Sequence, residues 1–126
     1  MLRANLESVY GVCRAALPHL ARGGSIVTVG ARVATKGGAG AAAYAVSKAA
    51  VQALTRVLAA ENRERGVRVN AVAPGTIDSA ANRATMPAGD TSRWTPPEEI
   101  AGVIVFLLSP ASAPVTGTVV PVDAYS

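Results

Sequence analysis

Residues 67–75 read Val67-Arg68-Val69-Asn70-Ala71-Val72-Ala73-Pro74-Gly75, and this stretch decides the fold class. Residues 67–72 predict a valine-rich strand, which the Pro-Gly dipeptide closes with a turn. The run Ser25-Ile26-Val27-Thr28-Val29 is β-branched and almost uniformly apolar, as expected of a parallel strand buried on both faces. Residues 117–122, Gly117-Thr118-Val119-Val120-Pro121-Val122, predict a third strand. Helical patterns separate the three runs, which indicates an α/β fold.

Three segments carry apolar residues at helical spacing. Residues 4–22 form the first, and an alanine-rich second segment covers residues 41–65, after which Gly66 is a natural C-cap. The third begins at Pro96-Pro97-Glu98-Glu99, because proline is tolerated in the first turn and carboxylates favour the positive end of the helix dipole. Thr95 is a candidate cap for this helix. The alternating order of helices and strands implies a parallel sheet with right-handed crossovers.

The composition narrows the class of protein but says nothing about chemistry. The chain has 126 residues, of which 50% are hydrophobic and 16% charged, so one α/β domain is expected. The formal charge of +4 is spread without a basic run, which predicts a solvated surface and no nucleic-acid site. With one cysteine, no apolar stretch of about 18 residues and no signal-peptide pattern, we expect a soluble cytoplasmic protein without a membrane span.

Tyr44 and Lys48 lie four residues apart near the start of the long helix, so both side chains project from one face and can reach a common ligand. A neighbouring ammonium stabilises the phenolate form of a tyrosine, which brings proton transfer within reach of neutral pH. Tyr44 could then serve as general acid or base for a carbonyl and alcohol pair. On spacing alone, an ordinary surface pair is the commoner meaning of Tyr-x-x-x-Lys.

The wider context changes that balance. The stretch Tyr44-Ala45-Val46-Ser47-Lys48-Ala49-Ala50-Val51, followed by residues 67–75, resembles the short-chain dehydrogenase/reductase family in order, spacing and structural setting. The resemblance runs from Asn5 to Val122. It implies that residues 1–126 are one domain, the C-terminal portion of a partial Rossmann-type, doubly wound parallel sheet. It also implies an NAD(P)-dependent oxidoreductase that acts on a carbonyl, an alcohol or a pterin-like substrate.

The resemblance assigns roles to individual residues. It makes Tyr44 the general acid or base and Lys48 its partner, which also binds the nicotinamide ribose. Asn5 corresponds to an asparagine that holds a relay water, although a capping asparagine is an equal alternative. Pro74-Gly75-Thr76-Ile77 and Ser79 correspond to the turn that meets the nicotinamide side of NAD or NADP. Independently, an open parallel sheet binds ligands at the carboxyl ends of its strands.

One departure from the family concerns the residue thirteen positions before the tyrosine, usually a serine that hydrogen-bonds the substrate oxygen. Here that residue is Ala31, in the run Val29-Gly30-Ala31-Arg32. The variant resembles dihydropteridine-reductase-like members, whose quinonoid substrate needs less polarisation. Thr28 and Thr35 are candidate substitutes, although Thr28 is expected to face a helix. Arg32 is expected either to contact an anionic substrate or to be solvated.

A second departure concerns the phosphates of the cofactor. Glycines 37, 38 and 40 do not directly follow a strand and lack the G-x-G-x-x-G spacing of a phosphate-binding turn. We therefore expect these residues alone to bind NAD or NADP poorly. The expected origin is a truncated product, a misassigned start codon or an excised fragment.

The remaining expectations concern assembly and the polar segment 76–95, which predicts a substrate-side loop with a short helix. Broad apolar stripes on residues 4–22 and 41–65 predict a homodimer or homotetramer, and an inactive dimerising fragment is the alternative to an enzyme. Trp94 is expected either to line a substrate pocket or to anchor its loop. His19 is expected at the surface, because no further metal-ligand residues surround it.

Overall fold

The computed structural model describes residues 1–126, which form a parallel sheet between two layers of helices. A π-helical turn and three short 3-10 helices adjoin the regular elements. In chain order the elements are the π-helical turn Arg3–Glu7, α1 Ser8–Ala16, a 3-10 helix Leu17–His19, β1 Ser25–Val29, α2 Val33–Lys36, α3 Ala42–Glu61, β2 Arg68–Pro74, α4 Ala80–Thr85, a 3-10 helix Thr91–Arg93, α5 Pro97–Leu108, a 3-10 helix Pro110–Ser112 and β3 Val119–Val122.

The sheet has the order β1-β2-β3, and both strand pairs are parallel. Ser25 pairs with Arg68 and Ala71 with Val119, so β2 is the central strand. Residues 69–74 are buried throughout, as expected of a central strand that is covered on both faces. The predicted parallel α/β sheet is confirmed.

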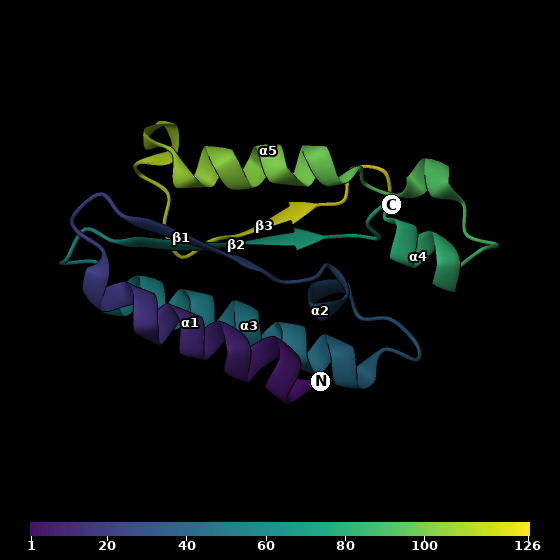
Figure 1. The fold of residues 1–126 in the computed structure, drawn as a ribbon, viewed down its shortest axis with the longest axis horizontal. Coiled ribbons are helices and arrows are strands. Elements are labelled where there is room, and N and C mark those ends of the chain that lie inside the picture. The colour runs from purple at the N-terminus through teal and green to yellow at the C-terminus, as the bar shows by residue number, and fades with distance from the viewer.

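Helices cover both faces of the sheet, with α1 and α3 on one face and α5 on the other (Figure 1). Side chains of β2 alternate between them. Val69 packs with Leu58 of α3 and Cys13 of α1, whereas Val72 packs with Leu107 of α5. Each fully buried valine or leucine of this kind contributes about 1.5–3 kcal/mol, so the two layers hold β2 in place from opposite sides.

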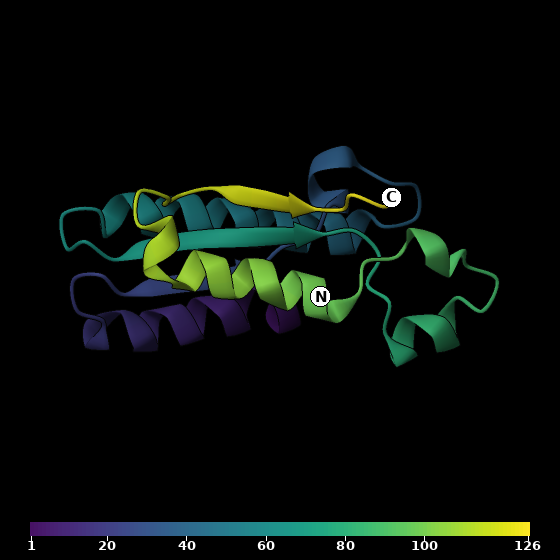
Figure 2. The same ribbon diagram turned by 90° about the horizontal axis from the view of Figure 1, so that it is seen from above.

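The two crossovers have opposite hands. Along the chain, each new strand is added on the same side of the previous one. Two such crossovers have the same hand only if their helices cover the same face of the sheet. Helices α3 and α5 cover opposite faces. Figures 1 and 2 together show a right-handed β1–α3–β2 unit and a left-handed β2–α5–β3 unit. The prediction of right-handed crossovers is wrong for the second unit. The long connection 75–96 lets the chain pass round the sheet end, and Ile100 of α5 then buries against Val72.

Two predicted helix caps differ from the structure. Helix α3 ends at Glu61 with Asn62 as its C-cap, and Gly66 instead supplies a φ of +68° in the turn that leads to β2. Thr95 does not cap α5, whose N-cap is Pro96. The Thr95 hydroxyl is 3.4 Å from the Val122 carbonyl, which it reaches because the two segments lie side by side. None of the helices is both long enough and apolar enough to span a membrane.

Candidate active site

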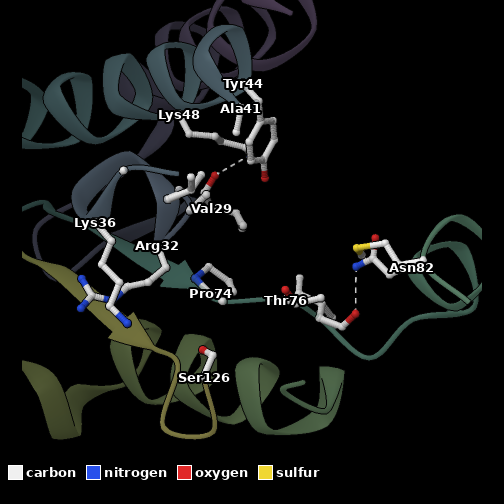
Figure 3. Close-up of a pocket in the computed structure, with 17 residues that line it drawn as sticks. Val29, Arg32, Lys36, Ala41, Tyr44, Lys48, Pro74, Thr76, Asn82 and Ser126 are labelled. Atoms are coloured by element: carbon white, nitrogen blue, oxygen red, sulfur yellow. Dashed lines mark hydrogen bonds between the residues drawn. The ribbon is translucent and has the colours of Figure 1, made fainter. Parts of the chain in front are cut away.

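A cavity of about 680 Å³ opens at the carboxyl ends of β1 and β2, where the start of α3 meets the turn after β2 (Figure 3). Parallel strands leave their ends free for ligands at this edge. Five of the predicted site residues line the cavity, from two segments that are far apart in the sequence. These are Tyr44, Lys48, Pro74, Gly75 and Ile77.

Tyr44 and Lys48 occupy the first two turns of α3 and face the cavity together. Tyr44 is 37% exposed and lines the cavity, so a ligand there can reach its side chain. The ammonium of Lys48 lies 5.9 Å from the centre of the Tyr44 ring, a distance at which a cation is attracted to the ring. The helical spacing of four residues therefore produces the proximity that the sequence predicts.

The Lys48 ammonium is anchored by the end of β1. Its Nζ donates a hydrogen bond of 2.9 Å to the carbonyl of Val29. Burial lowers the pKa of Lys48 below its usual value, because removal from water disfavours the charged form. The charge of Lys48 is therefore less well hydrated than it would be in open solvent. Because Lys48 lines the cavity, polar groups of a bound ligand can take the place of that water.

Asn5 lies in the π-helical turn Arg3–Glu7, not in the cavity with Tyr44. Its amide nitrogen donates to the hydroxyl of Ser47 at 2.9 Å, which places it beside the turn of α3 that carries Lys48. A second, smaller groove of about 380 Å³ between α1 and β1 is lined by Asn5, Lys48 and Val29 among others. Lys48 and Val29 line both cavities, so Lys48 separates Asn5 from Tyr44.

The turn after β2 presents backbone groups to the cavity. The N–H of Ile77 makes no hydrogen bond within the chain, whereas the Ile77 carbonyl accepts from the side chain of Asn82 at 2.8 Å. Ser79 does not line the cavity; it caps α4 by accepting from the N–H of Asn82 at 3.2 Å. A Cβ at Gly75 would lie 2.6 Å from the Ser126 hydroxyl, so a larger residue there would require the Ser126 side chain to move.

The segment after β1 depends on a residue that sequence reasoning missed. Gln52 of α3 is only 4% exposed, and its amide nitrogen donates to the carbonyl of Ala31 at 2.9 Å. A Cβ on Gly30 would lie 2.8 Å from the same nitrogen, so glycine is required for this approach. Gln52 stands eight residues after Tyr44, on the helix face next to Lys48, and that spacing was the available signal.

Neither of the two candidate threonines replaces the serine that is absent at Ala31. Thr28 is buried and its hydroxyl lies 2.6 Å from that of Thr55, so it faces α3 as expected. Thr35 does not line the cavity, and its hydroxyl is 3.5 Å from the Gln52 carbonyl oxygen. Ala31 itself is 5% exposed and contributes a methyl group to the wall of the cavity.

Charged side chains that the sequence did not group together flank the cavity. Nε of Arg32 donates to Oδ2 of Asp123 at 2.5 Å, and Nζ of Lys36 lies 3.6 Å from the same oxygen. The hydrogen bond from Arg32 holds the pKa of the Asp123 carboxyl below its usual value. Arg32 is therefore not a freely solvated side chain, because Asp123 is its partner. Its contact is 91 residues away in the sequence, beyond the reach of a local pattern.

The segment 75–96 closes one flank of the cavity. It contains the predicted short helix, α4, from which Asn82 and Met86 line the cavity. Trp94 is buried and is absent from the cavity wall; a Cβ on Gly89 would meet its ring, so Trp94 anchors this loop. His19 is exposed at the far end of α1, as expected.

Comparisons with known proteins agree with this arrangement. A family model described as Enoyl-(Acyl carrier protein) reductase matches residues 1–124. The chain belongs to the short-chain dehydrogenase/reductase family. The 3-oxoacyl-[acyl-carrier-protein] reductase of Vibrio harveyi is 38% identical, over 98% of this chain and 54% of the relative. The chain therefore spans about half the length of the curated relatives it matches.

Solved short-chain dehydrogenases also share the fold. A short-chain type dehydrogenase/reductase from Mycobacterium ulcerans has a TM-score of 0.90 at 30% identity, covering 98% of this chain and 50% of that one. A short chain dehydrogenase from Burkholderia cenocepacia in complex with NADP has a TM-score of 0.83 at 32% identity, covering 97% and 53%. The three strands thus correspond to part of a larger Rossmann-type sheet.

Within residues 1–126, the glycines at 37, 38 and 40 do not form the phosphate turn of such a sheet. Helix α2 separates them from β1, so they precede α3 without following a strand. A phosphate turn needs the strand-to-helix connection to direct backbone N–H groups at the pyrophosphate.

Proposed function

We propose that residues 1–126 form one domain, the C-terminal portion of an NAD(P)-dependent oxidoreductase that interconverts a carbonyl and an alcohol, or reduces a pterin-like C=N group. The observation that carries this proposal is the convergence of Tyr44, Lys48 and the turn after β2 on one cavity at the strand ends. The cofactor assignment is supported by the NADP in the similar Burkholderia cenocepacia structure and by the reductase name of the Vibrio harveyi relative.

Tyr44 is the proposed general acid and base. In the direction of reduction, its hydroxyl gives a proton to the substrate oxygen as that oxygen gains negative charge. The ammonium of Lys48, 5.9 Å from the ring, offsets the charge left on the phenolate. A bound dihydronicotinamide would supply the hydride. In the direction of oxidation, the same phenolate takes the proton of the alcohol.

Asn5 and Lys48 are the proposed route by which Tyr44 recovers its proton. Lys48 lines both the cavity and the groove that contains Asn5, so it connects Tyr44 with the solvent in the groove between α1 and β1. The hydrogen bond from Asn5 to Ser47 fixes the asparagine amide, whose oxygen remains available to a water molecule. Loss of Asn5 should therefore slow proton recovery more than it weakens substrate binding.

The nicotinamide side is the part of the cofactor that these residues fit. The free N–H of Ile77 can donate to a carboxamide oxygen, and Pro74 with Gly75 shapes the wall beside it. Ser79 already accepts a hydrogen bond as a helix cap, but a hydroxyl keeps one donor for a second partner. Lys48 is the proposed ligand of the ribose hydroxyls. Without a phosphate turn within residues 1–126, we expect NADPH to bind this chain more weakly than about micromolar.

Replacement of the Tyr44 hydroxyl is the direct test. Tyr44→Phe should reduce turnover of NADPH with a ketone or quinonoid dihydropterin about 100-fold or more, and leave cofactor affinity unchanged, in the full polypeptide that carries these residues. Lys48→Ala should damage both quantities. Tyr10→Phe, at an exposed tyrosine of α1 outside the cavity, is the matched control. The assignment fails if Tyr44→Phe keeps more than about a tenth of the activity.

A dimerising role is the second candidate function. Helices α1 and α3 both carry exposed apolar side chains. These side chains are Tyr10, Val12, Val46 and Val57. Exposed apolar residues on two neighbouring helices are one mark of an interface between copies, which supports a homodimer or homotetramer. This role is compatible with catalysis, and it is the role that these residues would keep if the chain were inactive alone.

A further inference from the structure

The charged side chains that line the cavity all have the same sign. They are Arg32, Lys36 and Lys48, and no aspartate or glutamate side chain lines it. Lys48 belongs to the proposed proton and ribose site, which leaves Arg32 and Lys36 without a role in the chemistry described above. Figure 3 shows these two on one flank of the cavity, whereas Thr76 and Asn82 occupy the other flank.

Arg32 is held in a fixed position by Asp123. Its Nε is bonded to Oδ2 of Asp123, and its side chain is 24% exposed, so it is ordered without being sealed from the cavity. The two terminal nitrogens of the guanidinium make no hydrogen bond within the chain. A guanidinium with a fixed plane and two free nitrogens matches the two oxygens of a carboxylate.

Together with Arg32, Lys36 gives this flank an excess of positive charge. Its ammonium lies 3.6 Å from the oxygen of Asp123 that also accepts from Arg32, and its side chain is 53% exposed. One carboxylate therefore faces two cations, so an anionic ligand group would balance the flank. Such a group would be attracted more strongly here than in open solvent, because the cavity walls exclude part of the water.

We propose that the substrate of this site is an anionic carbonyl compound whose carboxylate is bound by Arg32 and Lys36, while its carbonyl lies toward Tyr44. This assignment of substrate class rests on the proposed function for its reacting end, but the carboxylate subsite stands on the charges alone. It also compensates for Ala31. A substrate held at its carboxylate is positioned without the hydroxyl that Ala31 does not provide.

The test is a binding measurement without cofactor, which separates this proposal from catalysis. Benzoylformate and its methyl ester share the same carbonyl and differ in charge. We expect benzoylformate to bind the chain at least tenfold more tightly in a titration followed by NMR, with shifts at Gly30 and Gly75. Lys36→Gln and Arg32→Gln should each reduce that preference to threefold or less. Tyr44→Phe should leave it unchanged, because the hydroxyl acts only in turnover.

Arg56→Gln, which removes an exposed cation of α3 outside the cavity, is the control of equal net charge. Equal binding of the acid and the ester, no binding of either, or an equal loss in Arg56→Gln would overturn the proposal. Arg32→Gln removes the hydrogen bond to Asp123, so folding of that variant is checked by its NMR spectrum. Lys36 is exposed, and the Lys36→Gln result decides the matter if Arg32→Gln does not fold.

Discussion

Gly30→Ala should destabilise the protein through one identifiable contact. The new Cβ would lie 2.8 Å from Nε2 and 2.9 Å from Cγ of Gln52, both closer than van der Waals contact allows. Gln52 is buried and donates to the Ala31 carbonyl, so its carboxamide has no open space to enter without losing this hydrogen bond. The same segment carries the Val29 carbonyl that anchors Lys48, so the effect reaches the candidate active site.

The size of the effect follows from two contributions. An added methyl in a packed interior costs about 1–3 kcal/mol, and a buried polar group left without its partner costs about 1–3 kcal/mol. Because relaxation relieves one contribution at the expense of the other, we expect Gly30→Ala to lower the free energy of unfolding by about 1–3 kcal/mol. At a urea m-value of about 2 kcal/mol/M, the midpoint falls by roughly 0.5–1.5 M with an unchanged slope.

A double-mutant cycle with Gln52→Ala identifies the cause. Once the carboxamide is removed, Gly30→Ala should cost less than about 1 kcal/mol, giving a coupling energy of about 1–3 kcal/mol. Gly102→Ala is the matched control, since no atom lies within 4 Å of its added Cβ in α5, and it should stabilise by about 0.5–1 kcal/mol. The reasoning is refuted if Gly30→Ala costs the same with and without Gln52.

Three further outcomes are expected. Burial lowers the pKa of Lys48, so an NMR titration of its Nζ should give a midpoint below 10.5. The backbone chemical shifts of Val29 should change over the same pH range, because its carbonyl accepts from Lys48. A midpoint at or above 10.5 would contradict this. Ala31→Ser should raise turnover of a plain ketone on the order of tenfold or more, because it adds a hydrogen-bond donor for the developing oxyanion. Turnover of a quinonoid substrate should change little. Equal gains on both substrates would argue that the new hydroxyl does not stabilise the oxyanion. Light scattering at tens of micromolar should give the mass of a dimer or tetramer. The double substitution Val12→Glu with Val46→Glu should lower this mass. A monomeric mass for the unchanged chain would count against the apolar interface.

Local sequence patterns determined the elements of this protein. The run of β-branched residues at 25–29 is a strand with those bounds, because burial on both faces leaves little freedom in the choice of side chain. The proximity of Tyr44 and Lys48 follows from helical geometry alone, so the spacing of four residues was sufficient. The caps at Thr95 and Gly66 were misplaced by one to four residues, since the end of a helix depends on what packs beside it.

Tertiary structure decided what no window of sequence contains. The hand of the second crossover depends on which face α5 covers, and both hands are compatible with the same order of strands and helices. The pairing of Arg32 with Asp123 joins residues 91 positions apart, and the contact of Gln52 with Gly30 depends on the distance between α3 and β1. Propensity and periodicity are properties of neighbours along the chain, whereas the charge and shape of this cavity are set by segments that meet only after the sheet has formed.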